Sequence, residues 1–440
     1  MPRTSSAFHR PVAATAAAGV VAALSMLGAP AASAAVPDDC AGHTLDASTN
    51  TASDIQDMLD AAEPLICLRG TFVLGGPLAL TSPVYIYGLD AAVLDGNGNR
   101  MIDGESAGAS AVITIDGIRM TNGFQGESGI AIRAYSISVL NSTIDHMNGN
   151  GGAIDPSSDL YVENSLFEDN YANVGAAITF ANAEVTVVDS TFRSNSARDI
   201  GGAIFGKGVL TVTGSTFEDN TAGYYGAAVH NYEGETTVTN STFVDTSGDQ
   251  YSTVFLNSGS ISQSTFVNST DTLAVLTDGG GGASLRGNIF ASSTATPRLS
   301  TDSVFVDQGG NIFSSSQASE TGFVSGGSSL FDRTPAAVFG SNVLADNGGP
   351  TFTIALAAGS PALRAVPAAA STVITDQRGN PRFAPNDAGA VQVSPALPTP
   401  ELAATGVAAG PLAAVAAALL TAAGLAFGVN RRRARGSAAE

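Results

Sequence analysis

The tripeptide Ser190-Thr191-Phe192, followed by Asn195, returns 25 residues later as Ser215-Thr216-Phe217, followed by Asn220. Related tripeptides stand on both sides of this pair. The third residues of six such tripeptides are 23, 25, 25, 26 and 23 positions apart, which indicates a structural repeat. These marker residues are Ile144, Phe167, Phe192, Phe217, Phe243 and Phe266, with looser echoes at Ile118, Phe290 and Phe313.

A second motif has the same period. Gly201-Gly202-Ala203-Ile204 has counterparts that end at Ile154, Ile178 and Val229, so the final residues are 24, 26 and 25 positions apart. A unit of this length is too short for a propeller blade of about 40 residues, and it lacks the leucines and helix of a leucine-rich repeat. The sequence therefore predicts an all-β fold, a single-stranded right-handed parallel β-helix with one unit of about 24 residues in each coil.

The repeat also predicts where particular side chains lie. The marker phenylalanines should stack inside the coil, each contributing roughly 1.5 to 3 kcal/mol through burial. Asn170, Asn195 and Asn220 should form a ladder at one corner, where Asn tolerates left-handed backbone angles. The glycine and alanine positions of the second motif should be places where larger side chains do not fit.

The segment before the repeats predicts a capping element. Between Ala52 and Ala62, apolar residues three and four positions apart indicate a helix that Thr51 or Ser53 could cap. Such a helix would cover the exposed first edge of a stack of strands. Cys40 and Cys67, the two cysteines of the chain, predict one disulfide in an exported protein. Closing a loop of about 28 residues would stabilise the fold by roughly 3 to 4 kcal/mol.

Both ends of the chain have the pattern of processing signals. Basic residues, an apolar run and the small residues Ala32-Ser33-Ala34 predict a secretory signal peptide over residues 1–34. At the other end, Val407 to Val429 is an uncharged stretch of 23 residues, long enough to cross a bilayer core of about 30 Å as a helix in the precursor. Four arginines follow it, which would keep that end cytoplasmic and the folded part outside.

The pentapeptide Leu402-Ala403-Ala404-Thr405-Gly406 stands immediately before the apolar span. Together with the span and the arginine tail it resembles the sorting signal of sortase-anchored surface proteins of Gram-positive bacteria. Ala403 replaces the proline of the commonest form, and the variant is similar to that used by a sortase class of high-GC actinobacteria. The resemblance implies that a sortase cleaves between Thr405 and Gly406 and joins Thr405 to peptidoglycan. The chain would then be anchored to the cell wall, as the substrate of that enzyme.

Two further resemblances concern the folded part. From Ile144 to Phe266, the Gly-Gly-Ala-Ile and Phe-x-x-Asn patterns are similar to those of polymorphic outer-membrane adhesins. Downstream, Asn347-Gly348-Gly349-Pro350-Thr351 and Asp376-Gln377-Arg378-Gly379 resemble the terminal module of β-helix proteins often called choice-of-anchor. The expected organisation is a signal peptide (1–34), an N-terminal cap with the first coils (35–112), the β-helix (113–339), a C-terminal cap module (340–392), a Pro-rich spacer (393–401) and the sorting signal (402–440).

Charge limits the partners of this chain. Removal of residues 1–34 and 406–440 leaves 13 basic and 38 acidic residues, a formal charge of −25. Such a surface repels nucleic acids and anionic membranes, so we expect no nucleic-acid partner. Neutral glycans, basic proteins and divalent cations remain. No cofactor is expected, and the residues of any metal site are unknown; Ca²⁺ on the acidic turns is the open alternative, although the Gly-rich calcium nonapeptide is absent.

The register of the repeats aligns one set of candidate catalytic residues. Two residues past each marker, the column contains His146, Asp169 and Asp219. The two carboxylates would be two coils apart, about 9.6 Å, near the upper limit for the acid and base of an inverting glycosidase. The same residues also fit solvated corner positions with no catalytic role. A catalytic role for these carboxylates would indicate a wall-anchored polysaccharide lyase or glycoside hydrolase.

Aromatic residues off the marker positions favour binding instead. Tyr224, Tyr225, His230 and Tyr232 fall in or near turns, where rings on a rigid wall can hold sugars or protein loops. The same tyrosines could simply pack one turn against the next. The sequence therefore favours a cell-wall adhesin or other glycan- or protein-binding protein over an enzyme, with a passive structural stalk as the third reading.

Overall fold

The computed structural model describes residues 40, 42–123, 131–248, 252–267, 273–292, 298–299, 305–314, 323–325, 328–368 and 373–393. All of them belong to the first of two compact units, Met1–Pro395. The predicted signal peptide and sorting signal, including the predicted membrane span, lie outside the described residues, as do residues 394–401 of the predicted spacer. Within the described ranges, none of the helices combines the length and hydrophobicity of a membrane span.

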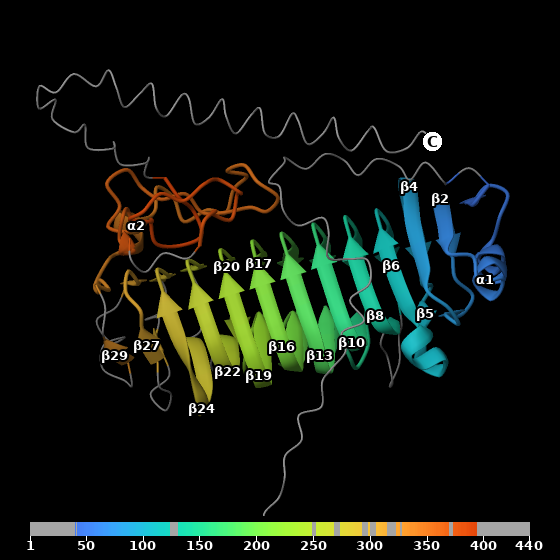
Figure 1. Cartoon of the computed structure of the whole chain (residues 1–440), viewed down its shortest axis with the longest axis horizontal. Helices are drawn as coiled ribbons and strands as arrows, with labels where there is room; N and C mark the ends of the chain where they lie inside the picture. Colours follow the sequence, from blue (N-terminus) through green and yellow to red (C-terminus); the bar gives the residue numbers. More distant parts are fainter. Residues whose placement is uncertain are drawn as a thin grey trace, which may run out of the picture. The chain divides into compact units, whose positions relative to one another are not determined.

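The described residues form a parallel β-solenoid of about ten turns with coils of about 24 residues, as the repeats predict. Within the array, strands pair in parallel with the equivalent strands one repeat before and after them. Phe167, for example, pairs with Ile144 on one side and Phe192 on the other. Figure 1 shows the strands of successive coils side by side and pointing the same way.

Long strands form the first rank of the solenoid. Most of their pairings contain a register shift where the strand bends. Their alternating side chains point into the core and out to the surface. The rank consists of β8 (Ile132–Leu140), β10 (Ile154–Glu163), β13 (Ile178–Val188), β16 (Ile204–Thr213), β19 (Val229–Thr239), β22 (Ser252–Ser262) and β24 (Leu273–Arg286).

Two ranks of short strands complete each coil. The middle residue of most strands in the second rank is a marker, and the third rank forms a separate sheet of four strands. The second rank is β7 (Arg119–Thr121), β9 (Thr143–Asp145), β11 (Leu166–Glu168), β14 (Thr191–Arg193), β17 (Thr216–Glu218), β20 (Thr242–Val244), β23 (Thr265–Val267), β25 (Ile289–Ala291) and β28 (Ile312–Phe313). The third is β12 (Tyr171–Val174), β15 (Ser196–Ile200), β18 (Thr221–Ala222) and β21 (Ser247–Gly248).

Further elements begin and end the array. At the N-terminal end, β4 pairs with β2 before it and with β6 and β7 after it. At the C-terminal end, β27 pairs with β24 and β29. These elements are β1 (Thr44–Asp46), α1 (Ala52–Asp60), β2 (Leu65–Val73), β3 (Leu78–Ala79), β4 (Val84–Asp95), β5 (Ile102–Asp103), η2 (Glu105–Ser110), β6 (Val112–Asp116), β26 (Arg298–Leu299), β27 (Phe305–Asp307), β29 (Phe323–Ser325) and α2 (Pro335–Val338).

The helix α1 lies where the sequence predicts it. Ile55 and Leu59 are buried in the same core as the first coils. Thr51 precedes the helix, and its backbone N–H donates to the Asp54 carboxylate at 2.6 Å. The predicted disulfide joins Cys40 to Cys67 on β2, and both residues are buried against Tyr87 and Leu89 of β4.

The marker side chains stack through the interior. Neighbouring rings from Phe167 to Phe331 have centroids 4.6 to 5.1 Å apart. Phe290 and Phe313 are members of the stack, so the period extends as far downstream as the sequence suggests. Upstream, the prediction of Ile118 is wrong, because Met120 pairs with Ile144. Ile118 instead occupies the Ser position of the motif, and its N–H donates to Ser142 Oγ at 3.1 Å.

The predicted asparagine ladder is present and buried. Asn170 Nδ2 donates to Asn195 Oδ1 at 2.9 Å, and Asn195 Nδ2 donates to Asn220 Oδ1 at 3.0 Å. The left-handed backbone position is one residue earlier than predicted, at Asp169 and Asp219, with φ of 53° and 52°. The asparagine therefore turns inward to bond the next coil, while its predecessor makes the corner.

The close approaches predicted for the second motif also occur. A Cβ at Gly202 would lie 1.9 Å from the carbonyl oxygen of Ala227, so no larger residue fits. Gly201 has φ of +66°, a conformation that glycine adopts readily, and a Cβ there would lie 2.7 Å from Phe205 Cβ.

Residues 340–392, here called the C-terminal module, pack along the second-rank face of the later coils. Val244, Val267 and Ile289 of these coils share a hydrophobic cluster with Ile354 and Val366 of the module. Backbone and side-chain hydrogen bonds reinforce the contact: the Thr216 hydroxyl donates to the Phe352 carbonyl at 2.7 Å, and the Thr242 hydroxyl donates to Gln377 Oε1 at 2.6 Å. The module thus covers one side of the coils from β17 onward.

Candidate functional site

Three aromatic residues occupy equivalent outward positions on successive long strands. Phe205 on β16 pairs with His230 on β19, which pairs with Phe255 on β22. The residues before them, Ile204, Val229 and Val254, are fully buried in the core. Because side chains alternate along a strand, the three rings lie on the outer face of the sheet, away from the core.

Two tyrosines join these rings in a continuous group, here called the aromatic patch (Phe205, Tyr225, His230, Tyr232 and Phe255). The His230 and Phe255 rings stack with centroids 4.2 Å apart and planes within 1°. Phe205 stacks on Tyr232 at 5.4 Å, and Tyr225 tilts against Phe255 at 5.9 Å. Each ring therefore touches at least one other ring.

The turns before these strands hold the aromatic patch in place. The backbone at Gly226 runs so close to the base of His230 that a Cβ there would lie 2.7 Å from His230 Cβ. His230 itself is only 6% exposed, whereas the other four rings are half-buried. The patch is thus ordered before any ligand arrives, which lowers the entropic cost of binding.

A polar pair borders the aromatic patch. Lys207 Nζ lies 2.5 Å from the Glu233 carboxylate, and both side chains are partly exposed. The hydrogen bond to Glu233 raises the pKa of Lys207, so the ammonium stays charged. Rings beside groups that donate and accept hydrogen bonds are a suitable surface for a sugar, which has apolar faces and a polar rim.

The predicted ligand-face residues have different surroundings. Tyr225, His230 and Tyr232 belong to the aromatic patch, whereas Tyr224 is 48% exposed on the preceding turn. Phe205 and Phe255 were not predicted. The predicted ligand face was chosen from residues in or near turns, and the alternation of side chains along the strands was not used. The register of Phe205 and Phe255 with His230, one residue after a buried aliphatic residue in each repeat, was the available signal.

The catalytic candidates lie on the exposed corner of successive coils. Asp169 and Asp219 stand at the left-handed corner position, with the coil of Ser194 between them. Aspartate tolerates this conformation better than most residues, which gives both a conformational role. His146 occupies the same corner position, and its Nδ1 lies 3.0 Å from Asp145 Oδ1.

Asp145 is the most constrained carboxylate near these candidates. It is buried, which opposes ionisation, but hydrogen bonds outweigh that effect and lower its pKa. Arg119 supplies two of them, at 2.6 and 3.2 Å. The pair bridges adjacent coils of the second rank and is therefore part of the scaffold. Across the part of the chain that the structure describes, no three His, Cys, Asp or Glu residues are grouped to hold a metal ion.

Comparison with known proteins shows similarity to a family described by its fold, and it names no ligand. Residues 89–243 match the family described as the right-handed β-helix region. This segment contains the first four phenylalanines of the stack, Phe167 to Phe243, and every ring of the aromatic patch except Phe255. None of the curated proteins matches the chain.

Proposed function

We propose that this chain is an adhesin, secreted and anchored to the cell wall of a Gram-positive, actinobacterial cell, where it binds a neutral glycan through the aromatic patch. The observation that carries the proposal is the set of outward rings on β16, β19 and β22, held in register by the solenoid. The signal-like residues 1–34 and the pentapeptide Leu402–Gly406 with its apolar span support display on the wall.

The charge of the chain favours a neutral ligand. A formal charge of −20 for the full sequence repels acidic polysaccharides, whereas contacts between aromatic rings and the apolar face of a sugar do not depend on charge. Rings that already pack on one another lose little freedom on binding. Loss of one half-buried ring should cost about 1 to 2 kcal/mol, or roughly 5- to 30-fold in Kd.

The test is retention of neutral oligosaccharides by cells that display the full-length chain. The double variant Phe205→Ala plus Tyr232→Ala should weaken retention by at least tenfold, because it removes a stacked pair of rings. Tyr171→Ala is the matched control, since Tyr171 is 43% exposed on β12, outside the aromatic patch. Equal retention by the double variant and the control would refute the glycan site. Cleavage of the oligosaccharide would instead support a lyase or hydrolase, and neither retention nor cleavage a passive stalk.

Anchoring is tested separately. Thr405→Ala should abolish covalent attachment, because sortase is proposed to join the Thr405 carboxyl to a peptidoglycan amine. The chain would then be released from purified walls by hot detergent, whereas the wild-type chain would remain until the walls are digested. Detergent release of the wild-type chain would refute covalent anchoring without bearing on glycan binding.

A further inference from the structure

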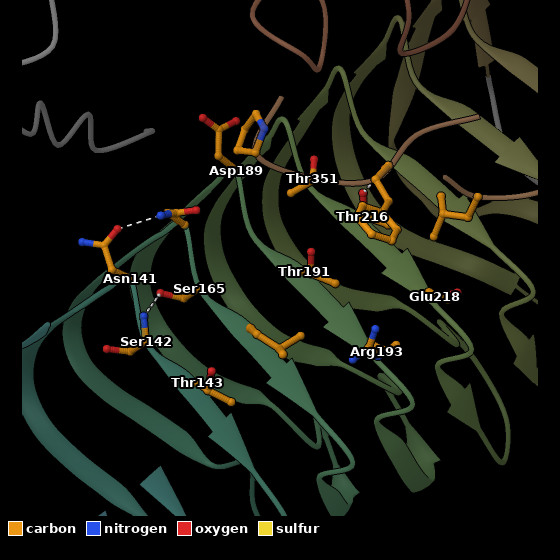
Figure 2. A pocket seen from close by; sticks show the side chains of 15 residues that line it. Asn141, Ser142, Thr143, Ser165, Asp189, Thr191, Arg193, Thr216, Glu218 and Thr351 are labelled. Atoms are coloured by element: carbon orange, nitrogen blue, oxygen red, sulfur yellow. Dashed lines mark hydrogen bonds between the residues drawn. The ribbon is translucent and has the colours of Figure 1, made fainter. Parts of the chain in front are cut away.

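A polar groove runs along the edge of the C-terminal module. It has a volume of about 290 Å³ and lies between the module and the second-rank face of β9, β11 and β14. One wall carries Asn141 and Thr143 of one coil and Asp189 and Thr191 of another (Figure 2), with the coil of Asn164 between them. The other wall is the module segment from Pro350 to Phe352.

The coil wall presents a row of hydrogen-bonding groups. Asn141, Asn164 and Asp189 hold the left-handed position before the Ser of each motif, with φ of 47°, 48° and 47°. Because the three positions are equivalent, their side chains repeat at the strand spacing of about 4.8 Å. Asn164 Nδ2 donates to Asn141 Oδ1 at 2.7 Å, and Asn141 Nδ2 donates to Asp116 Oδ1 at 2.9 Å, so the Asn164 carbonyl oxygen is the amide acceptor left for a ligand.

Asp189 is the half-buried member of this row. Within the described residues its carboxylate accepts no hydrogen bond, although a Cβ at Gly214 on the next coil would lie only 2.0 Å from Asp189 Oδ1. The absence of a side chain at Gly214 therefore makes room for the carboxylate. Burial, and secondly the charge of Glu163, raise the pKa of Asp189 to about 6.

The module wall supplies an aromatic ring that is fixed from behind. Phe352 is 50% exposed, yet its carbonyl accepts a hydrogen bond from the Thr216 hydroxyl at 2.7 Å. The neighbouring Thr351 hydroxyl donates to the Gly214 carbonyl, also at 2.7 Å. Two hydrogen bonds to one coil, at Gly214 and Thr216, thus hold an exposed ring at the edge of a polar row.

We infer that this groove is a second glycan-binding site, in which Phe352 contacts the apolar face of a neutral sugar while Asp189, Asn164 and Thr191 bond its hydroxyls. Planar amide and carboxylate groups opposite one ring suit a polyhydroxylated ligand. The inference does not rest on the aromatic patch, which lies on a different rank of strands.

Charge excludes an acidic sugar here. The groove contains two carboxylates, Asp189 and Glu218, and one cation, Arg193, whose guanidinium is already 2.6 Å from Glu168. Burial and then the charge of Asp219 raise the pKa of Glu218, which shows that further negative charge is unfavourable beside it. The module residues that line it are uncharged.

Protonation of Asp189 makes binding depend on pH. Below its pKa of about 6, Asp189 is protonated and loses acceptor capacity, so affinity should fall severalfold between pH 7 and pH 5. The charge of Glu163 acts on Asp189, and Glu218 lines the same groove. Asp189→Asn separates their effects from that of Asp189, because that variant should bind weakly with no fall between these pH values.

The experiment titrates the full-length chain, in mild detergent, with cellohexaose, xylohexaose, mannohexaose and chitohexaose. We expect at least one to bind at the groove, and Phe352→Ala and Asp189→Ala each to weaken that binding tenfold or more. Phe352 is exposed, so its variant should keep the wild-type circular dichroism and thermal midpoint. The double variant Phe205→Ala plus Tyr232→Ala should leave the groove affinity unchanged.

The outcomes separate the two sites. Binding that only the double variant weakens would support the aromatic patch and overturn the groove. Binding that only the Phe352 and Asp189 variants weaken would support the groove and count against the patch. No binding of any hexasaccharide, or binding of hexalysine that Asp189→Ala abolishes, would overturn the groove as a glycan site.

Discussion

Replacement of Asn195 by alanine tests the repeat at its most connected polar residue. The Asn195 side chain is fully buried and makes four hydrogen bonds. Its Nδ2 donates to Asn220 Oδ1 and to the Phe167 carbonyl, both at 3.0 Å. Its Oδ1 accepts from the side chain of Asn170 at 2.9 Å and from the Asn170 backbone at 3.3 Å.

The expected loss follows from these bonds. Each hydrogen bond contributes about 1 kcal/mol net, and groups left unpaired in the interior add a desolvation cost of about 1 to 3 kcal/mol each. Asn170 and Asn220 keep other partners, because Asn170 Nδ2 also donates to the Ile144 carbonyl and Asn220 Oδ1 also accepts from the Asn195 backbone. We therefore expect Asn195→Ala to lower the free energy of unfolding by about 3 to 4 kcal/mol.

Urea unfolding followed by far-UV circular dichroism measures this loss as a lower midpoint at unchanged slope. Asn173→Ala is the matched control, since Asn173 is half-buried on β12 and bonds one side chain, that of Asn150. The control should lose less than about 1 kcal/mol. Equal midpoints for the two variants would refute the view that the asparagine ladder stabilises the coils.

Three further perturbations have directions that the structure determines. Cys40→Ser plus Cys67→Ser should lower the thermal midpoint by an amount equivalent to about 3 kcal/mol, and a midpoint equal to that of the wild type would count against the disulfide. Gly202→Val should prevent soluble expression, because its Cβ would lie 1.9 Å from a carbonyl oxygen; a folded variant would contradict that packing. Hydrogen bonds led by Arg119 lower the pKa of Asp145 below 3.8, so this stabilisation is present above pH 3.8 and is lost at lower pH. Arg119→Gln should unfold at a higher pH than the wild type during acid titration, and coincident titrations would exclude this contribution.

The interior was predictable from sequence because it is periodic. The marker phenylalanines, the asparagine ladder and the glycine contacts each follow from one residue type at one spacing. The errors occurred where a position was occupied by another residue type. Ile118 replaces the usual serine beside the stack, so its apolar character suggested a marker two residues too early. The left-handed corner was assigned to asparagine, although the aspartate or serine before each asparagine takes that conformation.

The candidate sites were less predictable because they depend on contacts between distant segments. The aromatic patch needs the register of three strands, and the groove needs a module more than 130 residues downstream of its coil wall. The residues that directly follow each marker do indicate that one face of the later coils is covered. Glu168, Arg193 and Glu218 give way to Val244 and Val267, one coil after the first module contacts at Gly214 and Thr216. That change indicates a covered face, but it does not name the segment that covers it.

The contacts with the C-terminal module limit where this protein can gain or lose repeats. Among the described residues, the hydrogen bonds that join the coils to the module begin at Gly214, and loss of one complete unit upstream would rejoin equivalent residues on both sides of the cut. The coils from β17 onward also hold specific partners in the module, such as Thr242 with Gln377 and Gly287 with Gly389. Natural variation in the number of repeats should therefore accumulate upstream of Gly214 and be rare downstream, so that relatives differ in reach while keeping the same C-terminal end.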